Sequence, residues 1–345
     1  MTSEFTFELR VCRWAERAWP PDGTRDPETG VIVARQLGTG SRRWDTLVLE
    51  VDLGEYHRRK RFGPERLDSD LLHVLGHAPA DWEWYRDALP DPGYPWRYVR
   101  EAIHRAADRD ILETRRAGNR IEIRRRFVYP DWCRRIVAIE NKPDLDASAA
   151  RALADQLTHD VALSLADEVW LATEETGERI EPALLEQMPV QAGILATDEA
   201  GEADVVWHPR TLPVDEPGTR ILENPRPSGS ADYDLSAARF EYVDPKWKRE
   251  KRLAIAERAY ERGWRSYVDA MRPDCRHFEL RIAGDGLVPW CASKERHQTS
   301  AECSGGCPSF EPEPPTWRQS GWPIEGGPGR GLRRLLERRR DRARP

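Results

Sequence analysis

Glu140 and Lys142 end an apolar run in RIVAIENKPD, residues 135–144. Because alternate residues of a β-strand point to the same face, they share a face with Ile136 and Ala138. A carboxylate and an ammonium group therefore follow the face that should pack against the core. The carboxylate can bind a hard cation through oxygen, and the ammonium can offset the charge of an anionic substrate.

Two further carboxylates fall on faces that we expect to be buried. Residues 4–18 carry apolar side chains three and four positions apart, which indicates an amphipathic helix, and Glu8 lies on that apolar stripe. Residues 31–52 contain two β-rich runs around GTGS, the pattern of a hairpin. Asp45 shares a face with the leucines of the second run. Without a cation, such inward-facing acids would repel one another and would be costly to bury.

Each charged residue also has an ordinary interpretation. Glu140 and Lys142 can form a surface ion pair at the strand exit, which contributes only about 0–1 kcal/mol. Glu8 can reach water from the flank of its helix, and Asp45 can cap a turn. Three acids predicted to face inward from separate elements nevertheless favour a shared cation site.

The order of the predicted elements places these residues. Between 55 and 125 the chain turns basic, and short helices precede a helix, a strand, a Gly-Asn turn and a basic strand. This end of the segment resembles the recognition helix and wing of a winged helix-turn-helix module, although a plain α/β insertion with exposed basic residues fits equally. Without it, the order is α-β-β-β-α-β, and the strands at 191–199 and 204–210 extend the same sheet.

That order, with Asp45 on the second strand and Glu140-x-Lys142 on the third, resembles the PD-(D/E)XK nuclease superfamily. The resemblance covers roughly residues 4–52 and 130–175. It implies a restriction-endonuclease-like αβββαβ core in which Asp45 and Glu140 bind Mg²⁺ or Mn²⁺. It also implies that Lys142 holds or activates the attacking water, with Glu8 as a third carboxylate.

Two further residues enter through this resemblance. Gln156, on the helix after the third strand, matches a glutamine of the RecB-like branch, but Asp160 stands where that branch carries tyrosine. Asp131, in YPDW, supplies a literal Pro-Asp before the third strand and competes with Asp45 as the metal ligand. We favour Asp45 because strand alternation points it inward. As a whole, the chain also resembles a haloarchaeal family of unknown function, from EFTFEL through IENKPD to the late cysteines.

The second candidate metal site is a cluster of four cysteines. Cys275, Cys291, Cys303 and Cys307 follow C-x15-C-x11-C-x3-C in a segment with little apolar periodicity. Four thiolates there predict a Zn²⁺ or iron–sulfur site that orders the chain. Some RecB-like nucleases build a [4Fe–4S] cluster with one cysteine near the first helix, so Cys12 is a possible substitute. We favour Cys12 as a small core residue.

Bulk composition limits the possible classes of protein. The chain has 345 residues, a net charge of −6 and a mean hydropathy of −0.75, which is typical of a soluble protein. It lacks an apolar run of membrane length and a basic, greasy amino-terminal segment, so we expect a cytoplasmic location. Only six of its 54 basic residues are lysines, which makes a lysine at 142 informative because arginine does not replace a compact ammonium group easily.

These patterns predict an α/β protein with a divided nuclease-like core, an inserted module and a carboxyl-terminal metal-binding segment. The expected parts are the core at 1–54 and 126–210, a winged-helix-like module at 55–125, a linker at 211–245, a basic helix at 246–270, a cysteine segment at 271–311 and a flexible basic tail at 312–345.

The expected function is a divalent-metal-dependent DNA nuclease, in repair or defence, whose module, basic helix and tail contact phosphates. One alternative is a non-catalytic DNA-binding or regulatory protein that retains a nuclease-like scaffold and a structural metal site. Another is a structural metalloprotein whose acids are salt-bridged.

Overall fold

The computed structural model describes most of the chain. Its described residues are 4–40, 42–145, 147–174, 186, 188–198, 201–223, 239–264, 275–283, 286–298, 302–303 and 307–311. The basic tail expected at 312–345 lies outside them. Within these ranges, no helix combines the length and the apolar character needed to cross a membrane.

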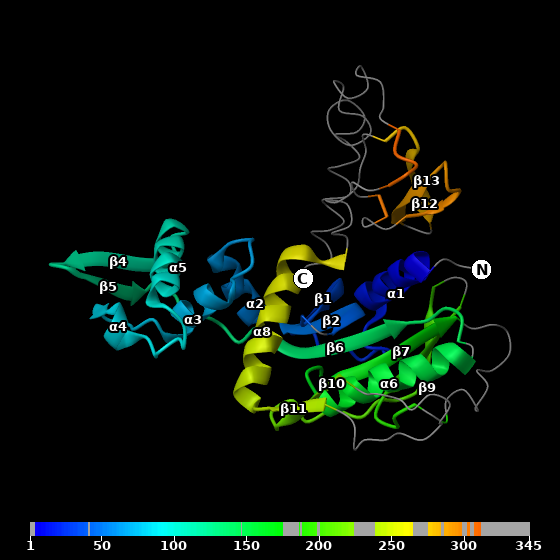
Figure 1. The fold of residues 1–345 in the computed structure, drawn as a ribbon, viewed down its shortest axis with the longest axis horizontal. Helices are drawn as coiled ribbons and strands as arrows, with labels where there is room; N and C mark the ends of the chain where they lie inside the picture. The colour runs from blue at the N-terminus through cyan, green and yellow to red at the C-terminus, as the bar shows by residue number, and fades with distance from the viewer. Residues whose placement is uncertain are drawn as a thin grey trace.

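A six-stranded mixed sheet forms the centre of the molecule, and the expected α/β class is confirmed (Figure 1). Its order is β1-β2-β6-β7-β8-β9, with β1–β2, β2–β6 and β8–β9 antiparallel and the other pairs parallel. The strands are β1 (Thr29–Gly38), β2 (Arg43–Asp52), β6 (Cys133–Asn141), β7 (Glu168–Glu174), β8 (Gly193–Thr197) and β9 (Ala203–Trp207). The two stretches expected to extend the sheet are β8 and β9.

Helices cover both faces of this sheet. Helix α1 (Glu4–Ala18), with the bounds expected from the sequence, packs on one face. Helices α6 (Ala147–Leu163) and α8 (Pro245–Arg262) contribute to the core on the other face. The side chains of β6 point alternately to the two faces. Ile136 and Ala138 belong to the α6–α8 core, whereas Val137 and Ile139 belong to the α1 core. Glu140 therefore continues the face that packs under α6 and α8.

The insertion between β2 and β6 has a core of its own, built mainly from leucine, alanine and aromatic side chains. It projects from one end of the sheet (Figure 1). Asp52 and Asp68 cap its first two α-helices, each by accepting a backbone N–H at 2.9 Å. Its elements are α2 (Leu53–Arg59), the 3₁₀ turn η1 (Lys60–Phe62), α3 (Ser69–His77), β3 (Glu83–Trp84), α4 (Tyr85–Ala88), α5 (Trp96–Asp108), β4 (Leu112–Ala117) and β5 (Arg120–Arg125).

The segment expected as a linker, 211–245, differs from that expectation. It contains β10 (Gly218–Glu223) and β11 (Arg239–Val243), which pair as an antiparallel hairpin, and β10 contacts α6. Gly218 has no room for a side chain, because an added Cβ would lie 2.3 Å from the carbonyl oxygen of Leu163. In the sequence of 211–245, the alternation of apolar and polar residues in these two strands is too short and irregular to stand out among the proline and aspartate residues.

Helix α8 also differs from the basic helix expected at 246–270. It begins after Asp244, which accepts the Trp247 N–H at 2.7 Å, and ends at Gly263, whose φ of 59° favours glycine. Its basic side chains are not all in solvent. Lys248 is fully buried and donates to two backbone carbonyl oxygens, because α8 packs across β1 and completes the core.

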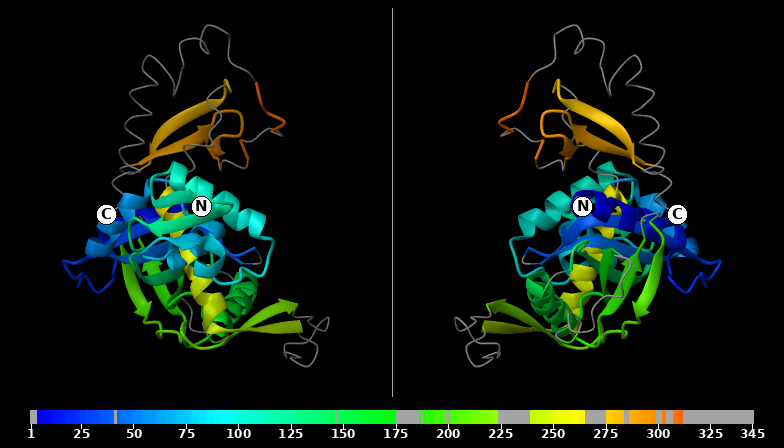
Figure 2. Two further views of the ribbon diagram at one scale, coloured as in Figure 1. Left: turned by 90° about the vertical axis from the view of Figure 1, so that its left-hand side faces the viewer. Right: turned by 90° about the vertical axis from the view of Figure 1, so that its right-hand side faces the viewer.

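The cysteine segment forms a separate small sheet of β12 (Phe278–Ala283), β13 (Gly286–Cys291) and β14 (Arg296–His297). Figure 2 shows it on the side of the molecule away from α6.

A buried ion pair ties the insertion to α8. Both side chains of Arg59 and Glu257 are at most 1% exposed, and two hydrogen bonds of 2.5 Å join them. Glu257 also accepts the Tyr129 hydroxyl and the Leu67 N–H, each at 2.7 Å. The carboxylate thus has four donors from three parts of the chain.

We therefore expect Glu257→Ala to lower the free energy of unfolding by about 3–5 kcal/mol, since it leaves the Arg59 guanidinium buried without its counter-charge. Urea denaturation followed by circular dichroism measures this loss. The control is Glu55→Ala, which breaks the exposed α2 pair with Arg58 and should cost less than about 1 kcal/mol. Equal losses in the two variants would contradict the anchoring role.

Candidate active site

Asp45 and Glu140 meet because β2 and β6 run antiparallel. The register pairs Thr46 with Ile139, so the start of β2 lies beside the end of β6. Asp45 Oδ2 accepts the backbone N–H of Asn141 at 3.1 Å. Strand pairing therefore brings together two residues that lie 95 positions apart in the sequence.

Glu8 joins this group from α1 through Gln36. The Gln36 amide donates to Glu8 Oε1 at 3.1 Å and to Asp45 Oδ1 at 3.2 Å. Gln36 has a φ of 53°, so β1 departs from regular strand geometry at this residue. Arg35 faces α1 and binds both Glu8 oxygens, at 2.8 and 3.0 Å, and the pair is almost completely buried.

Glu140 has a different cationic partner, Arg42 in the β1–β2 hairpin. Arg42 donates to Glu140 Oε1 at 2.6 Å and makes three contacts of 2.7–3.1 Å with the carboxylate of Asp160 on α6. Glu140 and Asp160 are each 3% exposed. One guanidinium therefore balances two buried acids.

The electrostatics of the group show a shortage of positive charge. Burial, followed by the charge of Asp45, raises the pKa of Glu140 to about 8, although Arg42 acts in the opposite direction. Burial also raises the pKa of Glu8 and Asp160, against the effect of their arginine partners. At neutral pH the protonated form of Glu140 predominates. A further cation at the site would favour its ionised form.

Lys142 lies at the same end of β6, one-third exposed, and its ammonium donates to Glu4 at 2.6 Å. Burial alone would lower the pKa of Lys142, but the bond to Glu4 and the charges of Asp45 and Glu140 raise it. The side chain is therefore a fixed ammonium ion at neutral pH. In this environment it can offset negative charge but cannot accept a proton.

The structure separates the remaining candidates. Asp131 is exposed and precedes β6, whereas Glu140 lies near its other end, so Asp131 does not share the carboxylate site. Gln156 is exposed on α6, and none of the hydrogen bonds described for the carboxylates comes from it. Asp160, one turn later, is the α6 residue that reaches the site.

Sequence reasoning missed both arginines and Gln36. The signal that could have found Arg42 is the requirement that buried acids have cationic partners, combined with its place in the hairpin next to Asp45. No periodic pattern points to a residue in a turn.

The oxygen-rich donor set fits a hard divalent cation. Asn141 Oδ1 adds a buried oxygen that has no hydrogen-bond donor in the described structure. Across the described ranges, however, no three His, Cys, Asp or Glu side chains form a preformed metal-binding group. The arginines and Gln36 hold the carboxylate oxygens instead.

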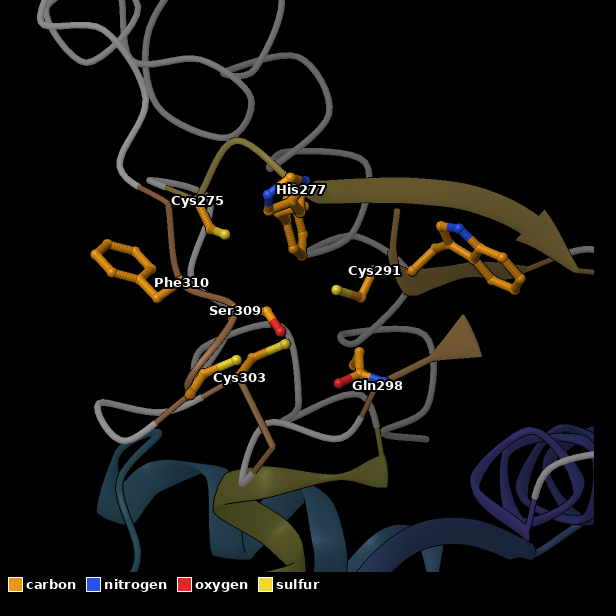
Figure 3. A pocket seen from close by; sticks show the side chains of 10 residues that line it. Cys275, His277, Cys291, Gln298, Cys303, Ser309 and Phe310 are labelled. Carbon is orange, nitrogen blue, oxygen red and sulfur yellow. The ribbon is translucent and has the colours of Figure 1, made fainter. Parts of the chain in front are cut away.

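The four late cysteines line one pocket. Figure 3 shows the thiols of Cys275, Cys291 and Cys303 directed into a common space. Burial, together with the other three cysteines, raises the pKa of the Cys303 thiol to about 11.

Cys12 does not line this pocket. It is buried between α1 and β2, where its sulfur lies 3.3 Å from Thr46 Oγ1. Burial raises its pKa to about 12. Cys12 thus belongs to the core under α1, and the structure does not place it as a substitute ligand for the late cysteines.

A family model described as "Family of unknown function (DUF5787)" matches residues 32–312. The chain belongs to this family. No curated protein and no solved structure matches the chain. The DUF5787 region includes Asp45, Glu140, Lys142 and the four late cysteines, whereas Glu8 lies before it.

The raised pKa of Glu140 gives a pH prediction for this DUF5787 protein. Between pH 4.5 and about 8 the folded state retains a proton that the unfolded state has lost, so Glu140 makes stability fall as pH rises. Glu140→Gln should remove this fall, which is of the order of 3–5 kcal/mol. Urea denaturation at pH 5, 7 and 9 measures it. Identical pH profiles for Glu140→Gln and wild type would contradict the shift, and the partly exposed Glu55→Gln is the control.

Proposed function

We propose that the protein is a divalent-metal-dependent nuclease with a PD-(D/E)XK-like core. The observation that carries the proposal is the meeting of Asp45 and Glu140 at one end of the sheet, joined by Glu8 from α1 and accompanied by Lys142. The element order α1-β1-β2-β6-α6-β7, with the insertion set aside, supports the same core.

Asp45 and Glu140 would hold Mg²⁺ or Mn²⁺, with Glu8 as the nearest additional carboxylate. When bound, such an ion supplies Lewis-acid polarisation of the phosphodiester and neutralises its developing negative charge. Glu140 Oε1 is the atom for which a cation would compete with Arg42. Arg42 retains its bonds to Asp160, which keep the hairpin in place.

Lys142 supplies the fixed positive charge beside these oxygens. Because its pKa is raised, it binds and orients an anion or a water molecule by donating hydrogen bonds, and it does not act as the general base. Glu4, its present partner, is 64% exposed and can be displaced by a phosphate oxygen at small cost.

The insertion suits a DNA-binding role. From α3 to β5 its order is helix, strand, two helices and a hairpin, which agrees with a winged-helix-like arrangement. Arg116 is exposed in the β4–β5 hairpin, and Arg115 pairs with Glu122. The same observation favours the second candidate, a DNA-binding protein that has kept the scaffold without cleavage.

We expect wild type to cleave plasmid or oligonucleotide DNA with Mg²⁺ or Mn²⁺. Asp45→Asn, Glu140→Gln and Lys142→Met should each lower the rate at least about 100-fold, since each removes a charge at the reacting phosphate. Gel electrophoresis of labelled DNA measures the rate. Asp131→Asn removes a carboxylate at the other end of β6 and should retain activity.

Cleavage that survives the three site variants would come from a contaminant and would overturn the site assignment. Sequence-dependent DNA binding without cleavage, lost in Arg115→Ala/Arg116→Ala, would support the second candidate. Thermal unfolding of every variant separates lost chemistry from lost folding.

We propose, in addition, that the four late cysteines hold a structural Zn²⁺ or an iron–sulfur cluster. Their convergence on one pocket supports this, and a bound cation would stabilise the Cys303 thiolate against the burial that raises its pKa. Zn²⁺ and iron–sulfur clusters both bind thiolate ligands.

Cys291→Ser and Cys303→Ser should therefore lower the metal content of the purified protein from about one site per chain to less than half. Elemental analysis and visible absorption of anaerobically purified protein measure the content and separate zinc from iron. Cys12→Ser should leave it unchanged, since Cys12 lies in the α1 core. Wild type that contains neither metal after such purification would contradict the proposal.

A further inference from the structure

We propose that a basic cleft between α8, the β1–β2 hairpin and the start of α3 binds the phosphate backbone of a nucleic-acid strand. Its volume is about 470 Å³. Four cationic side chains from three separate parts of the chain line it: Arg66, Arg220, Lys251 and Arg258. The inference rests on the proposed function, because it names nucleic acid as the ligand and places part of its path.

The cations of the cleft are poorly balanced by acids. The Arg258 guanidinium donates to the carbonyl oxygens of Gly38 and Ala254, and within the described residues neither it nor Lys251 has a carboxylate partner. Arg66 is half exposed, and its Nε forms only a long ion pair of 3.8 Å with Glu261 Oε2. Burial, followed by the charge of Arg66, lowers the pKa of Arg258, so like charges are crowded here.

Arg220 also lines the cleft, and its side chain is about one-third exposed. Its Nη1 lies 3.3 Å from Glu241, but its Nε is buried and lacks an acceptor in the described structure. A buried donor without an acceptor is uncommon, because it loses water without gaining a partner. A phosphate oxygen in the cleft would meet Nε only after a movement of the side chain that uncovers it.

The other groups lining the cleft do not oppose an anion. Among the described lining residues the one carboxylate is Asp68, which already accepts from Arg105 and from the Leu71 N–H. Trp247 lines the cleft, with the Lys251 ammonium 5.6 Å from its ring centre. An aromatic ring beside cationic side chains is a feature of surfaces that bind single strands, where a base stacks on the ring.

The cleft and the carboxylate site share a wall, the β1–β2 hairpin. Gly38 and Gly40 line the cleft, and Arg42, two residues later, reaches Glu140 and Asp160. Gly38 admits no side chain, since an added Cβ would lie 2.1 Å from the Arg42 carbonyl oxygen. A strand bound in the cleft would therefore lie against the turn that carries the partner of Glu140.

The test is binding of a fluorescein-labelled 20-nucleotide DNA, single-stranded and duplex, by anisotropy in EDTA at several salt concentrations. Arg66→Gln/Lys251→Gln should bind at least about tenfold more weakly at low salt. The slope of log K against log salt should become shallower by about 1–2. Both side chains are exposed, and thermal unfolding checks that the variant folds. Arg58→Gln/Arg276→Gln removes two exposed charges outside the cleft and should bind like wild type.

Unchanged affinity and slope in the cleft variant would overturn the proposal, as would wild type that binds no DNA. Displacement by inorganic phosphate as effectively as by unlabelled DNA, per phosphate, would assign the cleft to a free anion and also overturn it. Cleft-dependent binding without cleavage in Mg²⁺ would sink the nuclease function and leave this site standing. Cleavage in Mg²⁺ by a protein whose DNA binding does not depend on the cleft would support the nuclease function and overturn the cleft proposal.

Discussion

The buried carboxylates at one end of the sheet impose the constraint on which the site depends. A carboxylate removed from water must find donors and positive charge, or it takes up a proton. Here Arg35 serves Glu8, and Arg42 serves Glu140 together with Asp160. Both arginines lie near the β1–β2 turn. A change in the conformation of that hairpin would therefore move the arginines and change the pKa of the acids.

The periodic part of the fold follows from the sequence. A period of two placed Asp45 and Glu140 on inward faces, and the helical stripe of residues 4–18 did the same for Glu8. In the structure Glu8 and Asp45 share the Gln36 amide, and Asp45 accepts the backbone N–H of Asn141, the residue after Glu140. Helix and strand geometry fixes the direction of these side chains from local sequence alone, and antiparallel pairing brings the start of β2 beside the end of β6.

The other residues of the site and core lie where the sequence has no periodic pattern to predict their direction. Gln36 breaks the alternation of β1 with a positive φ, and Arg42 projects from a turn. The choice between Gln156 and Asp160 depends on the rotation of α6 about its axis, which core packing decides. The fate of Lys248 likewise depends on which face of α8 meets the sheet. Tertiary packing determines these outcomes, and a single sequence carries only weak signs of it.

The Arg59–Glu257 pair also bears on the synthesis of the chain, because its two partners leave the ribosome at different times. Its partners are 198 positions apart, so a ribosome adding about 5–20 residues per second needs roughly 10–40 s to deliver the second after the first. During that interval the face of the β1–β2 hairpin that α8 covers in the folded protein lacks this helix. The buried Arg59 guanidinium therefore acquires its counter-charge only after more than half of the chain has been made.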